Sequence, residues 1–213
     1  MSLALSDVAT EVGESYLSAR DSSHDAAVVA AYEHLQAETD QLFYALVRSD
    51  VPRPVRVVFT RCREPYASDA ELIAAVRACG VLEIVSAAVN SERIHPLLGC
   101  EFGGPFDRFR AIHDLIGHAR AGFGFGLQDE LAAWLTQARL HGSLARGALA
   151  TELLAINCAR SVLGEAPAQK AVLLEPELVR RDWDRVLTDQ PVVPTYADSW
   201  HARPPAIQPR EAS

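Results

Sequence analysis

His113 and His118, five residues apart, are the residues whose type and spacing point most directly to chemistry. They lie in the segment His-Asp-Leu-Ile-Gly-His, at the end of a stretch whose apolar residues recur at helical spacing from Phe106 to Ile116. His113 falls beside those apolar residues, so we expect it to face inward. Two imidazoles and one buried carboxylate are the ligands of a mononuclear non-haem iron site with open positions for dioxygen and substrate.

A regular α-helix would not aim both imidazoles at one ion. At about 100° per residue, five residues turn the second side chain roughly 140° away from the first. Gly117 offers a solution, because glycine readily adopts the left-handed conformation that ends helices. We therefore predict that the helix ends at Gly117 and that the chain swings His118 back toward His113. The alternative is two unrelated histidines near a helix end.

Glu152 is the expected third ligand, because it interrupts the apolar side of a second helix. A helical wheel of residues 144–163 puts Glu152 in the middle of the inward stripe rather than at its edge. An unpaired buried carboxylate costs several kcal/mol, so it is expected to bind a cation, coordinate a metal or stay protonated. Pairing with a buried arginine is the alternative.

A further helix is expected over residues 127–141, between the histidine helix and the Glu152 helix. Polar residues line up along the margin of its apolar stripe. Glu130 is the rival third ligand or a carboxylate for a second metal, and Gln137 and His141 are candidates for the same second metal or for a pocket wall. Trp134 is a candidate for substrate contact. An amphipathic helix with a solvated polar edge is the alternative.

Four further residues complete the candidate site. Arg108 and Arg110 could bind a substrate carboxylate as a two-donor fork, although surface pairing with Asp107 or Asp114 is the commoner fate of such arginines. Asp114 and Asn157 are expected to contact the ligands rather than the metal. His95 could enter the site from its loop, although a lone loop histidine is usually solvated.

The segment from His113 to Glu152 resembles the iron site of the pterin-dependent aromatic amino-acid hydroxylases. In that family a His-Glu-Leu-Leu-Gly-His segment and a later glutamate bind the iron, and this chain has Asp114 where the family has its first glutamate. The resemblance implies His113, His118 and Glu152 as ligands of Fe(II), with dioxygen as co-substrate. It covers roughly forty residues and includes no recognisable pterin-binding stretch, so pterin use is not supported.

A wider resemblance runs from about Pro96 to Asn157. Uncharacterised bacterial and phage proteins have a similar Phe-Arg-x-x-His-Asp-x-x-Gly-His-Ala core, a Glu-x-x-Ala-Trp segment and a terminal Glu-x-x-x-x-Asn. In those proteins a histidine stands where this chain has Gln137. The resemblance implies that this chain has lost a ligand or a second metal that they keep.

Composition bounds the classes of protein. A chain of 213 residues with 49% apolar and 23% charged residues is long enough for one well-buried domain. The net charge of −8 argues against sequence-independent binding of nucleic acid. We expect no membrane span and no signal peptide, and hence a cytoplasmic protein with a small-molecule substrate; homo-oligomerisation stays open. The four scattered cysteines predict reduced thiols.

The elements that must position these residues predict a mainly helical α+β single domain with a small β-sheet. A helix is expected over 23–47, a strand over 55–59, a helix from Ser68 to about Ala78 closed by Gly80, and a strand over 81–86. The three helices of the metal site and a last helix near 176–187 follow. Residues 1–22 are weakly patterned, residues 23–197 form the metal-binding domain, and residues 198–213 are a loose Pro-rich tail.

These expectations favour a non-haem iron monooxygenase acting on a small aromatic or amino-acid-derived molecule, a substrate class that the hydroxylase resemblance alone implies. A metal-dependent phosphohydrolase is the first alternative, because His113-Asp114 also resembles the paired ligands of HD-type enzymes. That family needs an upstream histidine and a later aspartate for which the chain shows no convincing match. A non-catalytic, metal-stabilised binding module is the second alternative.

Overall fold

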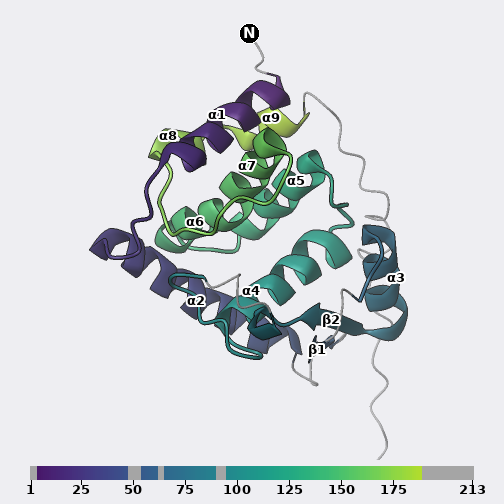
Figure 1. Cartoon of the computed structure of the whole chain (residues 1–213). Coiled ribbons are helices and arrows are strands. Elements are labelled where there is room, and N and C mark those ends of the chain that lie inside the picture. Colours follow the sequence, from purple (N-terminus) through teal and green to yellow (C-terminus); the bar gives the residue numbers. More distant parts are fainter. Residues whose placement is uncertain (1–3, 48–53, 62–64, 90–94, 189–213) are drawn as a thin grey trace, which may run out of the picture.

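A long helix runs through the middle of the molecule and touches both of its hydrophobic cores (Figure 1). It consists of α4 (Pro105–His113) and a π-helical continuation, η2 (Asp114–Arg120). Phe109 packs into the larger core, whereas Ile112 and Leu115 pack into the smaller one. Since both sides of this helix are buried, its orientation is fixed by packing. The computed structural model describes residues 4–47, 54–61, 65–89 and 95–188, and the statements below refer to those ranges.

The smaller core lies between this helix and a two-stranded parallel sheet. Strands β1 (Arg56–Thr60) and β2 (Val81–Val85) pair in register from Arg56 with Val81 to Thr60 with Val85, and helix α3 (Asp69–Cys79) connects them. The predicted N-cap opens α3, because the Ser68 hydroxyl accepts from the Glu71 amide at 3.3 Å. The Glu71 carboxylate accepts from the amide of Ala67, one residue before the N-cap, rather than from that of Ser68. Gly80 closes the helix with φ 63°, as predicted.

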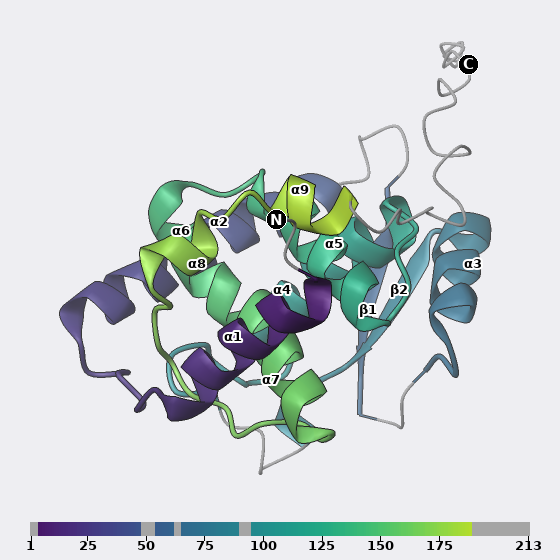
Figure 2. The same ribbon diagram turned by 90° about the horizontal axis from the view of Figure 1, so that it is seen from above.

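The larger core is built by helices, seen from above in Figure 2. Helix α2 packs against α4 and α6, α1 packs against α7, and α5 packs against η2 and η3. Their bounds are α1 Leu5–Ser18, α2 Ala26–Val47, α5 Leu127–Ala138, α6 Ser143–Leu149, η3 Ala150–Ala155 and α7 Ile156–Leu163. The 3₁₀-helix η1 (Ala87–Val89) follows β2, and η3 is a second π-helical segment, so α6, η3 and α7 form one continuous helical run.

The N-terminal segment 1–22, which shows little pattern in the sequence, contains helix α1. Its inward side is made of residues at helical spacing, with Val12 and Tyr16 fully buried. Gly13 lies on that side, where an added Cβ would come within 2.8 Å of the Cys158 carbonyl oxygen. Small residues let α1 approach α7 closely, and they weaken the apolar signal in the sequence.

The helix expected near 176–187 is two short helices, α8 (Pro176–Val179) and α9 (Trp183–Thr188). The tail at 198–213 lies outside the described residues. Cys79, Cys100 and Cys158 are free thiols, and burial raises the pKa of the Cys158 thiol to about 12. Among the described residues no helix is both long and apolar enough to cross a membrane. The protein is a mainly helical α+β domain with a small parallel sheet, as predicted.

Candidate metal centre

The π-helical segment η2 brings His113 and His118 together. A π-helix forms i→i+5 hydrogen bonds, so residues five apart lie about one turn apart on the same side. The Ala121 amide donates to the Ile116 carbonyl at 3.2 Å, which is a bond of this type. The two Nε2 atoms lie 3.1 Å apart and the rings are nearly perpendicular, at 86°. The sequence predicted that the two rings meet, but by a helix end at Gly117 rather than by a π-helical turn.

The prediction that Gly117 ends the helix in a left-handed conformation is wrong. The glycine with positive φ in this region is Gly122, at φ 82°, and the helix continues through Gly117 to Arg120. Gly117 is needed for another reason. An added Cβ there would lie 2.7 Å from the Ala133 Cβ and 3.5 Å from the His113 ring. Gly117 therefore lets η2 approach α5 closely.

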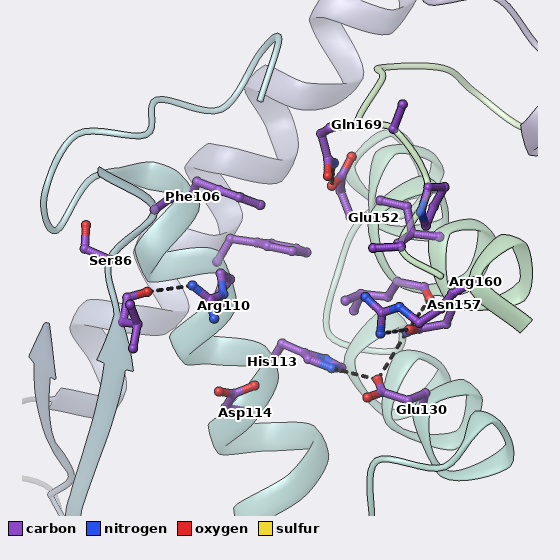
Figure 3. A pocket seen from close by; sticks show the side chains of 18 of the residues that line it. Ser86, Phe106, Arg110, His113, Asp114, Glu130, Glu152, Asn157, Arg160 and Gln169 are labelled. Atoms are coloured by element: carbon purple, nitrogen blue, oxygen red, sulfur yellow. Dashed lines mark hydrogen bonds and ion pairs between the residues drawn. The ribbon is translucent and has the colours of Figure 1, made fainter. Parts of the chain in front are cut away.

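Glu130, in the first turn of α5, completes a triangle of ligand atoms with the two histidines. Figure 3 shows its carboxylate beside His113. Its Oε2 atom lies 3.2 Å from His113 Nε2 and 3.9 Å from His118 Nε2. The circle through the three atoms has a radius of about 2.0 Å, which matches the bonds of a first-row divalent metal such as zinc to imidazole nitrogen or carboxylate oxygen. We call His113, His118 and Glu130 the triangle.

Both imidazoles of the triangle direct their other nitrogen to a carbonyl oxygen. His118 Nδ1 lies 3.0 Å from the Phe123 backbone carbonyl, and His113 Nδ1 lies 3.3 Å from the Gln137 side-chain carbonyl. Because a carbonyl only accepts, each Nδ1 carries the ring proton and donates it, and each Nε2 keeps a lone pair. With the Glu130 carboxylate, three electron-pair donors converge without a hydrogen between them. That arrangement is repulsive unless a cation, a proton or a metal, lies among them.

The electrostatics of the metal-free site follow from that convergence. Burial lowers the pKa of His113, but the hydrogen bond and negative charge of Glu130 outweigh it and raise that pKa above 6.5. Burial likewise raises the pKa of Glu130, but the hydrogen bond to His113 and its positive charge lower it below the usual value. Burial and the charge of His113 lower the pKa of His118. A proton held between His113 and Glu130 would take the place of the cation.

Neighbouring side chains hold the triangle in place. The Asn157 amide donates to Glu130 Oε2 at 3.2 Å and to the Leu153 carbonyl at 2.9 Å. Arg160 in turn donates to the Asn157 side chain at 3.2 Å. Asp114 lies beside the two histidines, since one ligand atom from each of the three residues falls within 4.8 Å of the others. Burial raises the pKa of the Asp114 carboxyl.

Glu152 belongs to a different network. Its Oε1 accepts from the Tyr32 hydroxyl at 2.5 Å and contacts His95 Nε2 at 3.0 Å, and its Oε2 accepts from the Gln169 amide at 2.8 Å. The π-helical segment η3 carries Glu152 at its third position. The structure thus brings Glu130, rather than Glu152, to the two histidines. We call Glu152, Tyr32, His95 and Gln169 the Glu152 network.

Two residues of each group line one cavity of about 720 Å³: His113 and Glu130 from the triangle, and Glu152 and Gln169 from the Glu152 network (Figure 3). In this view Glu152 and Gln169 are at one end, and His113 and Glu130 are at the other. Phe106, Phe109, Leu153 and Ile156 supply apolar wall, and Arg110, Asn157 and Arg160 supply polar wall. A cavity of this size suits a small organic molecule.

The remaining candidates divide into wall and core. Arg110 lines the cavity and donates to the Val85 carbonyl at 2.6 Å. Arg108 is paired through two hydrogen bonds with Asp40, 68 residues away, rather than with the expected Asp107 or Asp114. Trp134 is 1% exposed and packs edge-on against Trp183 in the helical core. Trp134 and Arg108 are not among the residues that line this cavity.

Gln137 and His141 are buried beside the triangle rather than in the cavity. Gln137 supports His113, and His141 Nδ1 lies 3.0 Å from the Gln137 backbone carbonyl. Gln137 Nε2 and His141 Nε2 have no hydrogen-bond partner among the described residues. The sequence placed both residues near the site. In the structure Gln137 contacts the His113 ring, and His141 contacts the backbone of α5.

Tyr32 is a functional candidate that the sequence did not single out, and His95 is one that was expected to be solvated. The His95 side chain is fully buried, contrary to the expectation of a solvated loop histidine. Tyr32 lies in the apolar stripe of α2, where its hydroxyl gives no signal of a partner 120 residues away.

Comparisons with protein-family models, with curated proteins and with solved structures found no match for this chain.

Proposed function

We propose that this protein is a non-haem iron enzyme that activates dioxygen at the triangle of His113, His118 and Glu130. What carries the proposal is the convergence of two lone-pair nitrogens and one carboxylate oxygen on a circle of about 2.0 Å radius. Two histidines and one carboxylate on one side of a ferrous ion leave open positions for dioxygen and substrate. Iron as the metal, and oxygen chemistry, rest on this ligand set and on the hydroxylase resemblance.

The side chains around the triangle have distinct tasks in this proposal. The Gln137 and Phe123 carbonyls fix the imidazole tautomers, and Asn157 orients the Glu130 carboxylate. The apolar wall, which includes Phe106 and Ile156, excludes water from the space beside the ligands and holds the body of the substrate.

Nitric oxide binding tests the open positions without knowledge of the substrate. The purified protein would be loaded with Fe(II) without air and treated with nitric oxide, a stable probe for the dioxygen position. We expect about one iron per chain and the half-integer-spin resonance of a ferrous nitrosyl. Glu130→Ala should abolish both, whereas Glu165→Ala, at an exposed position, should leave both intact. Iron that binds but gives no nitrosyl signal would contradict oxygen activation.

A metal-dependent phosphohydrolase is the second candidate, and the position of Asp114 favours it. Asp114 lies with His113 and His118 in one group of potential ligands, and Arg110 and Arg160 on the cavity wall could bind a phosphate. Release of phosphate from a generic aryl phosphate ester by the zinc- or manganese-loaded protein, lost in Asp114→Asn, would support it over the oxygenase.

A further inference from the structure

The hydrogen bonds of His95 show that it places no cation beside the Glu152 carboxyl group. His95 Nδ1 accepts from the backbone amides of residues 97 and 98, at 3.0 and 2.7 Å. An imidazole whose Nδ1 accepts is neutral and has its proton on Nε2, so His95 donates to Glu152. Tyr32 and Gln169 also donate, and each partner of the carboxylate is therefore a neutral donor.

This geometry also excludes Glu152 and His95 as a second metal site. A metal would need a lone pair on His95 Nε2, which the two amides at Nδ1 do not allow without an imidazolate. The Glu152 side chain is 1% exposed, and no lysine or arginine among the described residues forms an ion pair with it. A buried carboxylate without a cation is costly, and a positively charged group brought next to it would recover part of that cost.

A ligand bound in the cavity could supply such a positively charged group. Glu152 and Gln169 form one end of the cavity wall, as seen in Figure 3. A carboxylate offers about four lone-pair positions, and three are used by the network, which leaves one for a further N–H donor. Phe106, whose ring lies 5.3 Å from that of His95, is part of the adjoining apolar wall.

We propose that Glu152 is a binding site for the ammonium group of an amine, with the apolar body of that amine lying along the wall toward the triangle. The three donors fix the orientation of the carboxylate before the ligand arrives. Binding of an amine at Glu152 depends only on the cavity and not on the proposed iron chemistry. That its occupant is the substrate rests on the proposed function, and in that case the substrate is a primary amine with an aromatic or aliphatic body.

Calorimetry with three matched probes tests the site: phenethylamine, its neutral analogue phenethyl alcohol, and the anion phenylpropionate. The protein would be loaded with zinc, so that no redox chemistry interferes. We expect the amine to bind at least about tenfold more tightly than the alcohol, as for a charge-assisted hydrogen bond, and the anion to bind weakest. Equal binding of amine and alcohol, tighter binding of the anion, or no binding of the amine would overturn the proposal.

Two variants and one control locate the effect. Glu152→Gln should abolish the preference for the amine and leave the affinity for the alcohol unchanged. Gln169→Lys, at a half-buried position, places a tethered ammonium beside Glu152 and should abolish amine binding even if Glu152→Gln does not fold. Glu165→Gln, at an exposed position, controls for the loss of one negative charge. A preference for the amine that survives in either of the first two variants would contradict the assignment.

The nitric oxide experiment on the same protein separates this proposal from the function. If the protein gives no nitrosyl signal but prefers the amine through Glu152, the oxygenase proposal is contradicted and the amine site stands. A nitrosyl signal together with equal binding of amine and alcohol would do the reverse.

Discussion

The two histidine–glutamate groups of this protein are made of the same residue types and differ in where the imidazole protons lie. In the triangle, carbonyl oxygens face Nδ1 of His113 and His118, so Nε2 is left as an electron-pair donor. In the Glu152 network, backbone amides face Nδ1 of His95, so Nε2 is a hydrogen-bond donor. The partner at the far side of each ring thus decides whether a neighbouring carboxylate shares a metal with it or receives a proton donor from it.

Replacing the histidines one at a time should separate the two groups most strongly. His113→Ala or His118→Ala removes a ligand and should lower metal affinity at least about a hundredfold. His95→Ala should leave metal affinity within about threefold and lower thermal stability instead, because it removes a donor from a buried carboxylate. Metal titration and thermal unfolding of the three variants give the comparison. Equal metal loss in all three would merge the two groups into one site.

Gly117→Val should damage the triangle but not the Glu152 network. The new side chain would press on Ala133 and move η2 away from α5, which separates the histidines from Glu130. We expect loss of most metal binding with little change in helical content, measured by metal analysis and circular dichroism. Ala133→Gly in the same chain should restore part of the binding, since it removes the atom that collides. Full metal affinity in Gly117→Val alone would contradict the close approach.

Gln137→Leu tests whether the far side of the ring matters as much as the comparison requires. Losing the acceptor for His113 Nδ1 should lower metal affinity about 10- to 100-fold without removing a ligand. Gln169→Leu is the matched change in the Glu152 network and should leave metal affinity unchanged. Both are measured by competition with a chelator. A larger effect from Gln169→Leu would reverse the assignment of the two groups.

The smallest expected effect is on proton binding in the metal-free protein. Because of Glu130, His113 should titrate above 6.5, and because of burial and His113, His118 should titrate below it, as nuclear magnetic resonance of the ring protons can follow. A raised pKa makes His113 favour folding below 6.5, and this contribution is lost as the pH rises through the raised pKa. A metal binds only the neutral ring, so lowering the pH should weaken metal binding. Because the pKa of His113 is raised, this loss of affinity should begin at a pH above 6.5. Both histidines titrating below 6.5 would contradict the pairing with Glu130.

Residue spacing carried more information about the site than helical periodicity did. His113 and His118, and likewise Glu152 and Asn157, are five residues apart, and each pair spans a π-helical segment or its edge. A wheel of ideal helical pitch cannot place such pairs on one side, which led to a helix end at Gly117 that does not exist. Five-residue spacing of polar residues in an apolar helix would have been the better signal, since π-helical turns often occur at functional sites.

The choice between the two glutamates could not be made from the sequence. On a wheel of ideal pitch Glu152 lies centrally and Glu130 at the margin, yet Glu130 contacts the histidines. Burial predicted that Glu152 needs partners, and it has them, but they are neutral donors from α2, from the loop at 95 and from the loop at 169. Such long-range partners leave no local pattern. The sheet and its capped helix were predictable because their signals are local.

Metal titration of Glu130→Gln and Glu152→Gln beside the unchanged protein tests the central claim most directly. Both substitutions keep the size of the side chain and remove its charge. We predict that the unchanged protein and Glu152→Gln bind about one Fe(II) per chain with similar affinity, and that Glu130→Gln loses that affinity at least about a hundredfold. Metal loss in Glu152→Gln with retention in Glu130→Gln, or two metals per chain lost equally in both, would contradict the triangle of His113, His118 and Glu130.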